Sequence, residues 1–408
     1  MDTPYAWFRL AVAVTLATIG GVGIWSMVVA LPAVQAEFGI DRASASLPYT
    51  MTSIGVVIGS MLMGKLSDRF GIMVPVIGGS IALGVGYIAV SYSPDIVVFV
   101  AIFCVLIGML GGSAVFGPLV ADTSLWFERR RGIAIAFAAC GMYFAGTIWP
   151  PIIAWLIQSF GWRDAHFYVG VFCILSMLPL SLVLRRPPPP QPAPVVAPDG
   201  RPDRPLGMPR EVLQGALVVA GISCCVAMSM PQVHIVAYCV DLGYSTARGA
   251  EMLSLMFGFG ALSRLVSGWI LDRIGGLATA LLGSTLQAAA LALYLPFDGL
   301  MSLYVISSVF GLVQGGIVPS YAYVVREFFP AREAGFRVSL TLSATLAGMA
   351  LGGWLSGAIY DIYGTYQAAL LNGIAWNLGN MLILMWLLLR LRRSLAPATP
   401  LGNAAQAD

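Results

Sequence analysis

Charged residues are scarce in this sequence of 408 residues: 10% are Asp, Glu, Lys or Arg, whereas 58% are hydrophobic. A soluble protein needs more charge than this to cover a surface that faces water, so the composition excludes a soluble domain. The mean hydropathy of +0.85 is typical of a chain that crosses a membrane many times. The net charge of +3 is small and scattered, and it gives no reason to expect nucleic acid as a partner.

Residues that build common enzyme sites are also few. The chain has two histidines, His166 and His234, and no nucleophile-elbow pattern, which argues against hydrolase and metal sites. Its six cysteines lie in apolar runs without CxxC spacing, so we expect neither disulfides nor metal binding. A G-x-x-x-x-G-K pattern at Gly59–Lys65 precedes Leu66 instead of Ser or Thr and falls in an apolar helix, which excludes a nucleotide site. We therefore predict that the protein is not an enzyme and has no cofactor.

Apolar segments long enough to cross a bilayer recur between short polar breaks, and about twelve are expected by the criterion of ~20 residues. The N-terminus has no basic run and no small-residue cleavage site, so the first span is expected to be retained and not removed as a signal peptide. The predicted spans cover residues 8–31, 47–64, 72–92, 95–121, 132–158, 164–185, 210–238, 247–268, 277–296, 299–325, 335–359 and 367–390.

The basic residues outside these spans divide by loop parity. Arg42, Arg163 and Arg248 fall on one side of the membrane, and most of the other basic residues, including Lys65, fall on the opposite side. Because cytoplasmic loops carry the excess of Lys and Arg, we expect both chain termini in the cytoplasm. The preference for arginine over lysine is typical of a GC-rich bacterial genome, so the expected location is the cell inner membrane.

The chain also repeats itself. A proline-dense segment, Arg185–Pro209, divides it almost in half, and the pattern G-x-x-x-D-R-x-G occurs at Gly64–Gly71 and again at Gly268–Gly275. Duplicated six-span units are typical of alternating-access transporters that bind substrate between the halves. The predicted organisation is a six-helix bundle over residues 1–186, a cytoplasmic linker over 187–209, a second six-helix bundle over 210–392 and a cytoplasmic tail over 393–408.

The eighth span contains a single arginine. Arg264 lies eight residues before Asp272, which places its Cα about 12 Å inside a hydrocarbon layer about 30 Å thick. A guanidinium keeps its charge there at a cost of roughly 3 kcal/mol, so Arg264 is a functional candidate by default. Gly260 and Ser267 share its helical face, and bulky residues share the opposite face: Leu262, Val266 and Trp269. The alternative is an arginine that snorkels to the cytoplasmic headgroups.

The turn pattern, in a chain of about twelve spans with a cytoplasmic middle linker, resembles the major facilitator superfamily. The resemblance implies an all-α membrane protein of twelve transmembrane helices in two pseudo-symmetric six-helix bundles. It also implies a gate formed by the charged residues of the turns, with Asp122 as the acidic partner of Arg69 or of the triplet Arg129–Arg131. The gating residues that it assigns are Asp68, Arg69, Asp122, Asp272 and Arg273. A turn that merely obeys the positive-inside rule is the alternative.

A narrower resemblance joins Trp126–Gly146 and Pro231–Ser245 with the span that carries Arg264. These stretches look like the monocarboxylate transporter and oxalate:formate antiporter branch, which implies that Arg264 binds a carboxylate as a bidentate pair. The chain departs from monocarboxylate carriers because it has no basic residue from Leu10 to Leu31, and Gly260 replaces their aspartate. It also lacks the basic residue that oxalate carriers have in span 11, which favours one carboxylate over two.

Other polar residues within the spans are expected near the substrate. His234, about 10 Å inside the outer surface, could supply the protonatable group that the missing aspartate would otherwise provide, although a membrane histidine also serves as an interhelical hydrogen-bonding group. Tyr143, Asn372 and Asn377 are the other expected contacts, with helix packing as their alternative role.

The predicted function is secondary transport of small, monocarboxylate-like organic anions by a monomer, driven by symport of an ion such as a proton or by exchange. The alternative is a multidrug or aromatic-compound exporter of the same superfamily, in which Arg264 is structural. A receptor or channel would not need duplicated gating turns.

Overall fold

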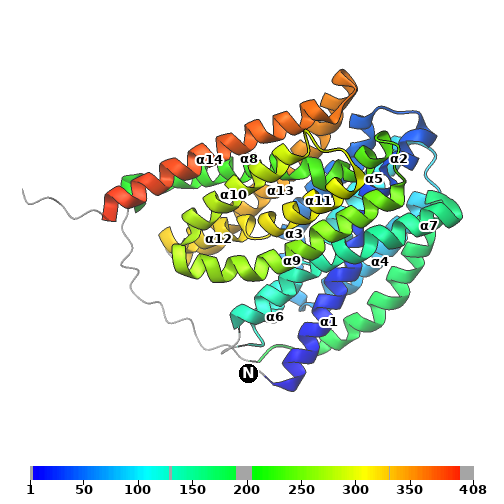
Figure 1. Cartoon of the computed structure of the whole chain (residues 1–408). Coiled ribbons are helices and arrows are strands. Elements are labelled where there is room, and N and C mark those ends of the chain that lie inside the picture. The colour runs from blue at the N-terminus through cyan, green and yellow to red at the C-terminus, as the bar shows by residue number, and fades with distance from the viewer. Residues whose placement is uncertain (1–2, 128–130, 190–204, 330, 396–408) are drawn as a thin grey trace, which may run out of the picture.

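The computed structural model describes residues 3–127, 131–189, 205–329 and 331–395, except for the side chains of Asp68 and a few other residues. Every regular element in these ranges is a helix. The elements of the first half are α1 (Pro4–Gly20), α2 (Val22–Phe38), α3 (Arg42–Phe70), α4 (Met73–Ser91), α5 (Ile96–Ile102), the π-helix η1 (Phe103–Gly112), α6 (Gly117–Ser124), α7 (Arg131–Leu182) and the short η2 (Val183–Arg185). Figure 1 shows the long helices packed side by side.

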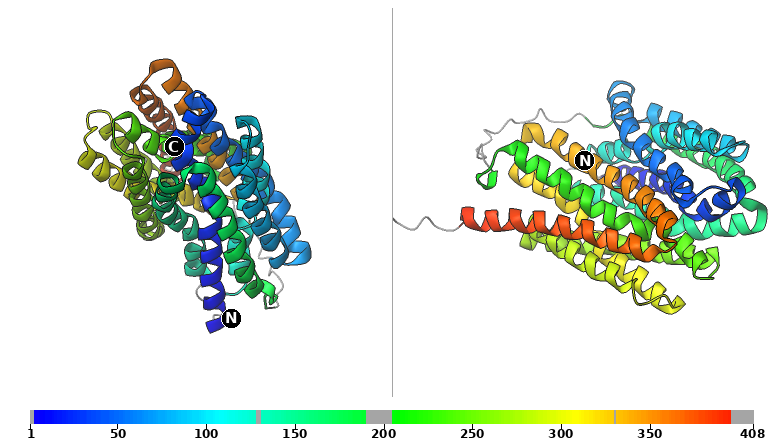
Figure 2. Two further views of the ribbon diagram at one scale, coloured as in Figure 1. Left: turned by 90° about the vertical axis from the view of Figure 1, so that its right-hand side faces the viewer. Right: turned by 90° about the horizontal axis from the view of Figure 1, so that it is seen from above.

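The second half repeats this arrangement of long helices. Its elements are the short η3 (Pro205–Gly207), α8 (Arg210–Asp241), α9 (Thr246–Ile274), α10 (Gly276–Leu293), α11 (Leu300–Gln314), α12 (Ile317–Phe328), α13 (Ala331–Tyr363) and α14 (Tyr366–Leu395). Seen from above in Figure 2, the blue to teal helices of the first half form one group and the green to red helices of the second half form another. The chain is therefore built as two bundles.

The described residues contain 11 helices long and apolar enough to cross a membrane, and one of these, Phe137–Arg185, has 49 residues. Gly161 is the non-helical residue inside α7, with φ at 82°, a conformation that a residue with a Cβ rarely adopts. The chain turns there, so α7 contains two crossings, which correspond to the predicted spans 132–158 and 164–185. The predicted fold of twelve transmembrane helices in two bundles is confirmed.

Two spans that the sequence predicts as continuous are broken in the structure. Span 95–121 consists of α5, η1 and α6, with a non-helical turn before α6, and span 299–325 is interrupted between α11 and α12. The first break follows the glycine pair Gly111–Gly112, and the second consists of the pair Gly315–Gly316. The two pairs have the same sequence offset as the duplicated G-x-x-x-D-R-x-G turns. Irregular backbone at membrane depth is tolerated where protein surrounds it, and broken helices of this kind commonly lie beside transport sites.

The bundles meet along two pairs of helices. The most extensive contacts between them are those of α3 with α13 and of α7 with α9. Each pair joins the second span of one half to the fifth span of the other, as expected for halves related by a pseudo-two-fold axis. Within the bundles, α4 packs on α7 and α8 packs on α13. The predicted linker and tail fall largely on residues 190–204 and 396–408, which lie outside the described ranges, so those boundaries remain predictions.

Candidate functional site

Arg264 reaches from α9 across the boundary between the bundles to α7. Its Nη1 donates a hydrogen bond to the backbone carbonyl of Ala139 at 3.3 Å, and its guanidinium carbon lies 4.6 Å from the centre of the Tyr143 ring. Its Nε is buried and lacks a hydrogen-bond partner in the described part of the chain. The side chain therefore points to the opposite bundle, which disfavours an arginine that snorkels along its own helix to the headgroups.

The two faces of α9 have the predicted character. Leu262, Val266 and Trp269 are 50%, 49% and 58% exposed on the molecular surface, as expected for residues that contact lipid. On the opposite face Gly260 is buried, and a Cβ at this position would lie 2.6 Å from Cε1 of Tyr143. Only glycine leaves room for the tyrosine that supports the guanidinium.

The broken span of the second bundle supports Arg264 through its backbone. Gly315, in the break between α11 and α12, packs against the carbonyl of Gly260, and a Cβ there would lie 2.9 Å from the backbone nitrogen of Arg264. Any side chain at this position would push α9 away from the break. The Gly-Gly pair thus fixes the place of α9 and, through it, the position of the arginine.

Aromatic rings continue from Tyr143 along the boundary between the bundles. The ring of Phe257, two helical turns before Arg264 on α9, lies with its centroid 5.8 Å from that of Tyr143 and 4.1 Å from that of Trp25 on α2. Trp25 and Phe257 are 6% and 4% exposed. Neither residue was expected at the site from the sequence, because aromatic residues in apolar spans usually serve packing.

A second group of charges joins the bundles at the ends of α3, α8 and α13. The Arg42 cluster, as we call it, consists of Arg42, Asp241, Tyr360, Asp361 and Tyr366. Arg42 is 7% exposed, its Nη2 lies 3.0 Å from Oδ1 of Asp241, and its guanidinium lies over the rings of Tyr360 and Tyr366 at 4.6 and 5.8 Å. A buried guanidinium such as that of Arg42 needs matched partners, and here the partners come from the opposite bundle.

Backbone groups strengthen the same cluster. Asp361 accepts hydrogen bonds from the backbone N–H groups of Arg42 at 2.8 Å and Ala43 at 2.7 Å. Asp41 accepts from the N–H of Ser44 at 2.7 Å, and hydrogen bonds from Ser44 lower the pKa of the Asp41 carboxyl. The free N–H groups at the start of α3 are thus capped from two bundles at once.

Comparison with known proteins identifies the family. A model of the Major Facilitator Superfamily matches residues 13–320 and 252–406. The chain belongs to the major facilitator superfamily. Among its relatives, Monocarboxylate transporter 13 of Bos taurus is 28% identical over 351 residues, which cover 83% of this chain and 79% of the relative. Agnestins efflux protein AgnL12 of Paecilomyces divaricatus is 22% identical over 357 residues, which cover 86% of this chain and 80% of that relative.

Solved structures agree on the fold. The chain superposes with a TM-score of 0.74 on a bacterial homolog to the human lysosomal transporter Spinster in an inward-facing and occupied conformation, at 15% identity and with 98% of this chain and 100% of that chain covered. The superposition on a peptide transporter POT in complex with sulfate has a TM-score of 0.73 at 15% identity, with 96% of this chain and 95% of that chain covered. The protein is thus a multi-pass membrane transporter of this superfamily and not an enzyme, and it resembles monocarboxylate transporters in sequence.

The structure places the predicted histidine of this transporter beside the Arg42 cluster. His234 is fully buried; its Nε2 lies 2.8 Å from the carbonyl of Gly353 and its Nδ1 lies 2.9 Å from the Tyr366 hydroxyl. A neutral ring satisfies both contacts if Nε2 donates and Nδ1 accepts. No contact in the described ranges joins it to Arg264.

The two predicted asparagines lie on α14. Asn377 is fully buried and donates from Nδ2 to the carbonyl of Ser284 at 2.7 Å, which ties α14 to α10 within the second bundle. Asn372 is half-buried. Neither makes a contact with Arg264 in the part of the chain that the structure describes, whereas Tyr143 does.

The duplicated turns lie at the opposite end of the bundles from the Arg42 cluster. Arg69 is exposed with its guanidinium near the Phe70 ring, and Asp272 and Arg273 are exposed with Arg273 over the Trp269 ring at 3.8 Å. The side chain of Asp68, residues 129 and 130 of the predicted basic triplet and the side chain of Arg131, its third member, lie outside the described part.

Asp122 has a partner that was not expected from the sequence. Arg9 of α1 donates to it from Nε at 3.0 Å and from Nη2 at 3.1 Å, so the pair is bidentate, and both side chains are buried. Arg9 also lies over the Trp126 ring at 4.6 Å. In this conformation Asp122 therefore pairs with α1 of its own bundle and not with Arg69.

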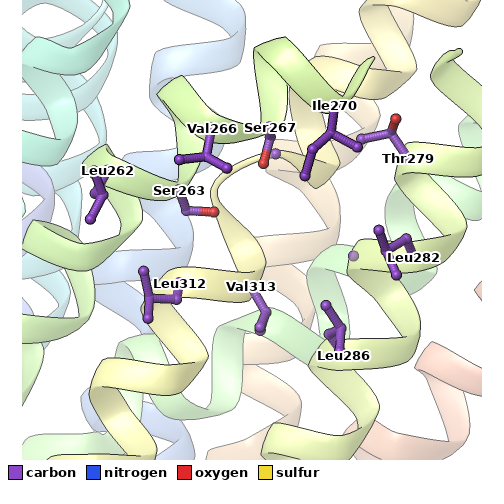
Figure 3. A pocket seen from close by; sticks show the side chains of 12 residues that line it. Leu262, Ser263, Val266, Ser267, Ile270, Thr279, Leu282, Leu286, Leu312 and Val313 are labelled. Atoms are coloured by element: carbon purple, nitrogen blue, oxygen red, sulfur yellow. The ribbon is translucent and has the colours of Figure 1, made fainter. Parts of the chain in front are cut away.

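A pocket on α9 lies away from the arginine. Figure 3 shows it between α9, α10 and α11, where aliphatic side chains such as Leu262, Val266 and Leu286 surround the hydroxyls of Ser263, Ser267 and Thr279. It has no charged lining residue, and several of its walls belong to the exposed face of α9. We assign it to the surface that faces lipid. The described residues contain no cluster of His, Cys, Asp or Glu that could hold a metal ion.

Proposed function

We propose that this transporter is a secondary carrier of small organic anions and that Arg264 binds the substrate carboxylate. The observation that carries the proposal is the Arg264 guanidinium, which lies between the bundles with a carbonyl and an aromatic face as its contacts and with no carboxylate pairing with it in the described ranges. An intramembrane cation without an anionic partner marks a substrate site by default. A carboxylate would replace one 3.3 Å hydrogen bond with a bidentate, charge-assisted pair.

The names of two relatives point to two kinds of transport. Monocarboxylate transporter 13 is named for a carboxylate substrate, which supports this substrate class, whereas AgnL12 is named as an efflux protein. The second candidate function is therefore export of aromatic compounds, which the ring layer of Trp25, Phe257 and Tyr143 favours. In that case the rings and not the guanidinium would hold the substrate.

The transport cycle that we propose uses the Arg42 cluster as the outer gate. The excess of loop arginines at the other end supports an orientation with the Arg42 end outside the inner membrane and both termini in the cytoplasm. Described hydrogen bonds between the bundles extend from Arg264 and Ala139, through Thr50 and the Ala350 carbonyl, to Asp361 and the start of α3. With this orientation, the arrangement supports a carrier that is closed to the outside. Access from the outside requires the Arg42 cluster to separate, and the duplicated turns are the proposed inner gate.

A proton is the coupling ion that we propose, with His234 as its acceptor. Protonation would make Nδ1 a donor to the Tyr366 hydroxyl, which can accept as well as donate, and it would add a second positive charge beside Arg42. The added charge would disfavour the closed Arg42 cluster. A proton bound at His234 while the cluster is open to the outside would therefore have to be accommodated before closure, which couples proton uptake to the conformational cycle.

Titration of the purified protein with benzoate and with methyl benzoate tests the proposal. An anion carrier binds the acid and not the neutral ester, since the ester cannot form the charge-assisted pair with Arg264. Equal binding of both compounds would favour the exporter of aromatic compounds instead.

A further inference from the structure

Trp25 is a residue of α2 whose ring turns to the opposite bundle. Its neighbours face their own bundle: a Cβ at Gly23 would meet Ile107, and the Ser26 hydroxyl lies 2.5 Å from the Tyr87 hydroxyl. The Trp25 ring instead packs on Phe257 of α9 at 4.1 Å between centroids. It is therefore placed at the boundary where a substrate between the bundles would lie.

The indole N–H of Trp25 is buried and has no hydrogen-bond partner in the described structure. Leaving a buried donor unpaired costs about 1–3 kcal/mol. By contrast, the indole of Trp149 donates to the carbonyl of Thr18 at 2.8 Å. Trp126 also has an unpaired indole N–H, but it lies at the Arg9 end of the first bundle, away from the boundary. Trp25 therefore differs from Trp149 in its unpaired N–H and from Trp126 in its position at the boundary between the bundles.

A continuous layer of rings connects Trp25 with Arg264. Phe257 contacts Trp25, Tyr143 contacts Phe257, and the Arg264 guanidinium lies over Tyr143. Phe257 and Arg264 are two turns apart on one face of α9, a rise of about 10 Å. The two unpaired donors, Nε of Arg264 and Nε1 of Trp25, thus lie at opposite ends of an apolar, aromatic surface and belong to different bundles.

We infer that Trp25 is a second substrate-binding residue and that the substrate is an elongated carboxylate with a hydrogen-bond acceptor at its far end. This inference rests on the proposed role of Arg264. The carboxylate would pair with Arg264, a flat apolar body would lie along the rings of Tyr143 and Phe257, and a carbonyl or ether oxygen would accept from Trp25. An anion as short as lactate cannot reach both donors. A neutral donor in the first span also suits a substrate with a single negative charge.

Calorimetric titration with two acids of similar size tests the inference: 4-acetylbenzoate carries the distal acceptor, and 4-isopropylbenzoate does not. The wild type is expected to bind 4-acetylbenzoate more tightly. Trp25→Phe retains the ring and removes the N–H, so it should weaken binding of 4-acetylbenzoate by about fivefold to tenfold and leave 4-isopropylbenzoate unchanged. The second ligand shows in the same variant that the protein is folded. Trp126→Phe, which also removes an unpaired indole N–H, should change neither affinity.

The outcomes separate this inference from the proposed function. If Arg264→Lys weakens both ligands while Trp25→Phe affects both equally or neither, the role of Trp25 is overturned and the carboxylate site stands. Equal binding of the two acids by the wild type likewise overturns the distal acceptor. If the wild type binds neither acid, the anion site itself is contradicted, and the role of Trp25 falls with it.

Discussion

The carboxylate of Asp361 accepts hydrogen bonds from the backbone N–H groups of Arg42 and Ala43, so a residue of the second bundle caps the first turn of a helix in the first bundle. The N-terminus of a helix carries a partial positive charge, and a carboxylate there is stabilising. Arg42 adds an ion pair with Asp241 at the same point. These interactions are lost together when the bundles separate, which gives this end of the molecule a definite closed state.

Asp361→Asn should shift the protein toward the conformation that is open at this end. The amide loses the charge and one of two acceptors, and a cap of this kind contributes about 0.5–2 kcal/mol. A cysteine introduced at Thr50, which is 8% exposed and hydrogen-bonded to the Ala350 carbonyl across the boundary, should react with an impermeant maleimide about threefold to tenfold faster in the variant. The exposed Asp298, changed to Asn, is the matched control. Equal labelling rates with and without Asp361→Asn would contradict a role of Asp361 in the gate.

Cysteines placed at Asp272 and Asp298 should be labelled from opposite sides of the membrane. Both side chains are exposed, and they lie at the two ends of the span that is formed by α10. The excess of loop arginines predicts that Asp272 faces the cytoplasm and Asp298 the outside. Labelling of both from the outside of intact cells would refute the orientation and, with it, the assignment of the Arg42 cluster to the outer gate.

Asp122→Asn should destabilise the first bundle. The buried Arg9 guanidinium would lose its bidentate partner, and breaking a buried pair from one side costs about 3–5 kcal/mol. Thermal unfolding of the purified protein should therefore begin at a markedly lower temperature. Asp272→Asn, at an exposed position, should leave the transition nearly unchanged. A normal transition for Asp122→Asn combined with slower transport would instead assign Asp122 to the gate and not to stability.

His234→Gln should remove the pH dependence of uptake. The glutamine amide can still donate to the Gly353 carbonyl, but it does not take up a proton near neutral pH. Wild-type uptake into proteoliposomes is expected to rise as the external pH falls, whereas uptake by the variant is expected to be flat between pH values of about 5 and 8. His166→Gln, in the first bundle, is the control and should retain the wild-type profile. An unchanged pH profile of uptake in His234→Gln would show that His234 is not the proton acceptor.

Local chemistry made much of this architecture predictable from the sequence. Long apolar runs define the spans because every backbone group must be paired inside the membrane. The cost of a midplane guanidinium selected Arg264, and its partner Tyr143 was among the expected contacts. The turn at Gly161 falls between two predicted spans, whereas the breaks at the glycine pairs were not predicted, because a glycine in an apolar run does not reveal whether the helix continues through it.

The remaining features depend on contacts between residues distant in sequence. Arg42 was assigned only to a loop, since its partners Asp241 and Asp361 are 199 and 319 residues away. Arg9 and Asp122 are separated by 113 residues, and no local pattern connects them. Charged residues near span ends look alike in a sequence whether they face water or pair across a bundle, so only the packing distinguishes them.

The dissociation constant of benzoate, measured by calorimetry for the wild type, Arg264→Lys and Arg264→Ala, tests the central claim most directly. Lysine retains the charge but loses the planar fork, so the affinity of Arg264→Lys should fall about tenfold or more. Removal of the cation in Arg264→Ala should weaken binding by about thirtyfold to several thousandfold. Arg248→Lys, at an exposed position, should bind as the wild type does. Equal dissociation constants for the wild type and Arg264→Lys, with both proteins folded, would contradict the assignment of Arg264 as the carboxylate anchor.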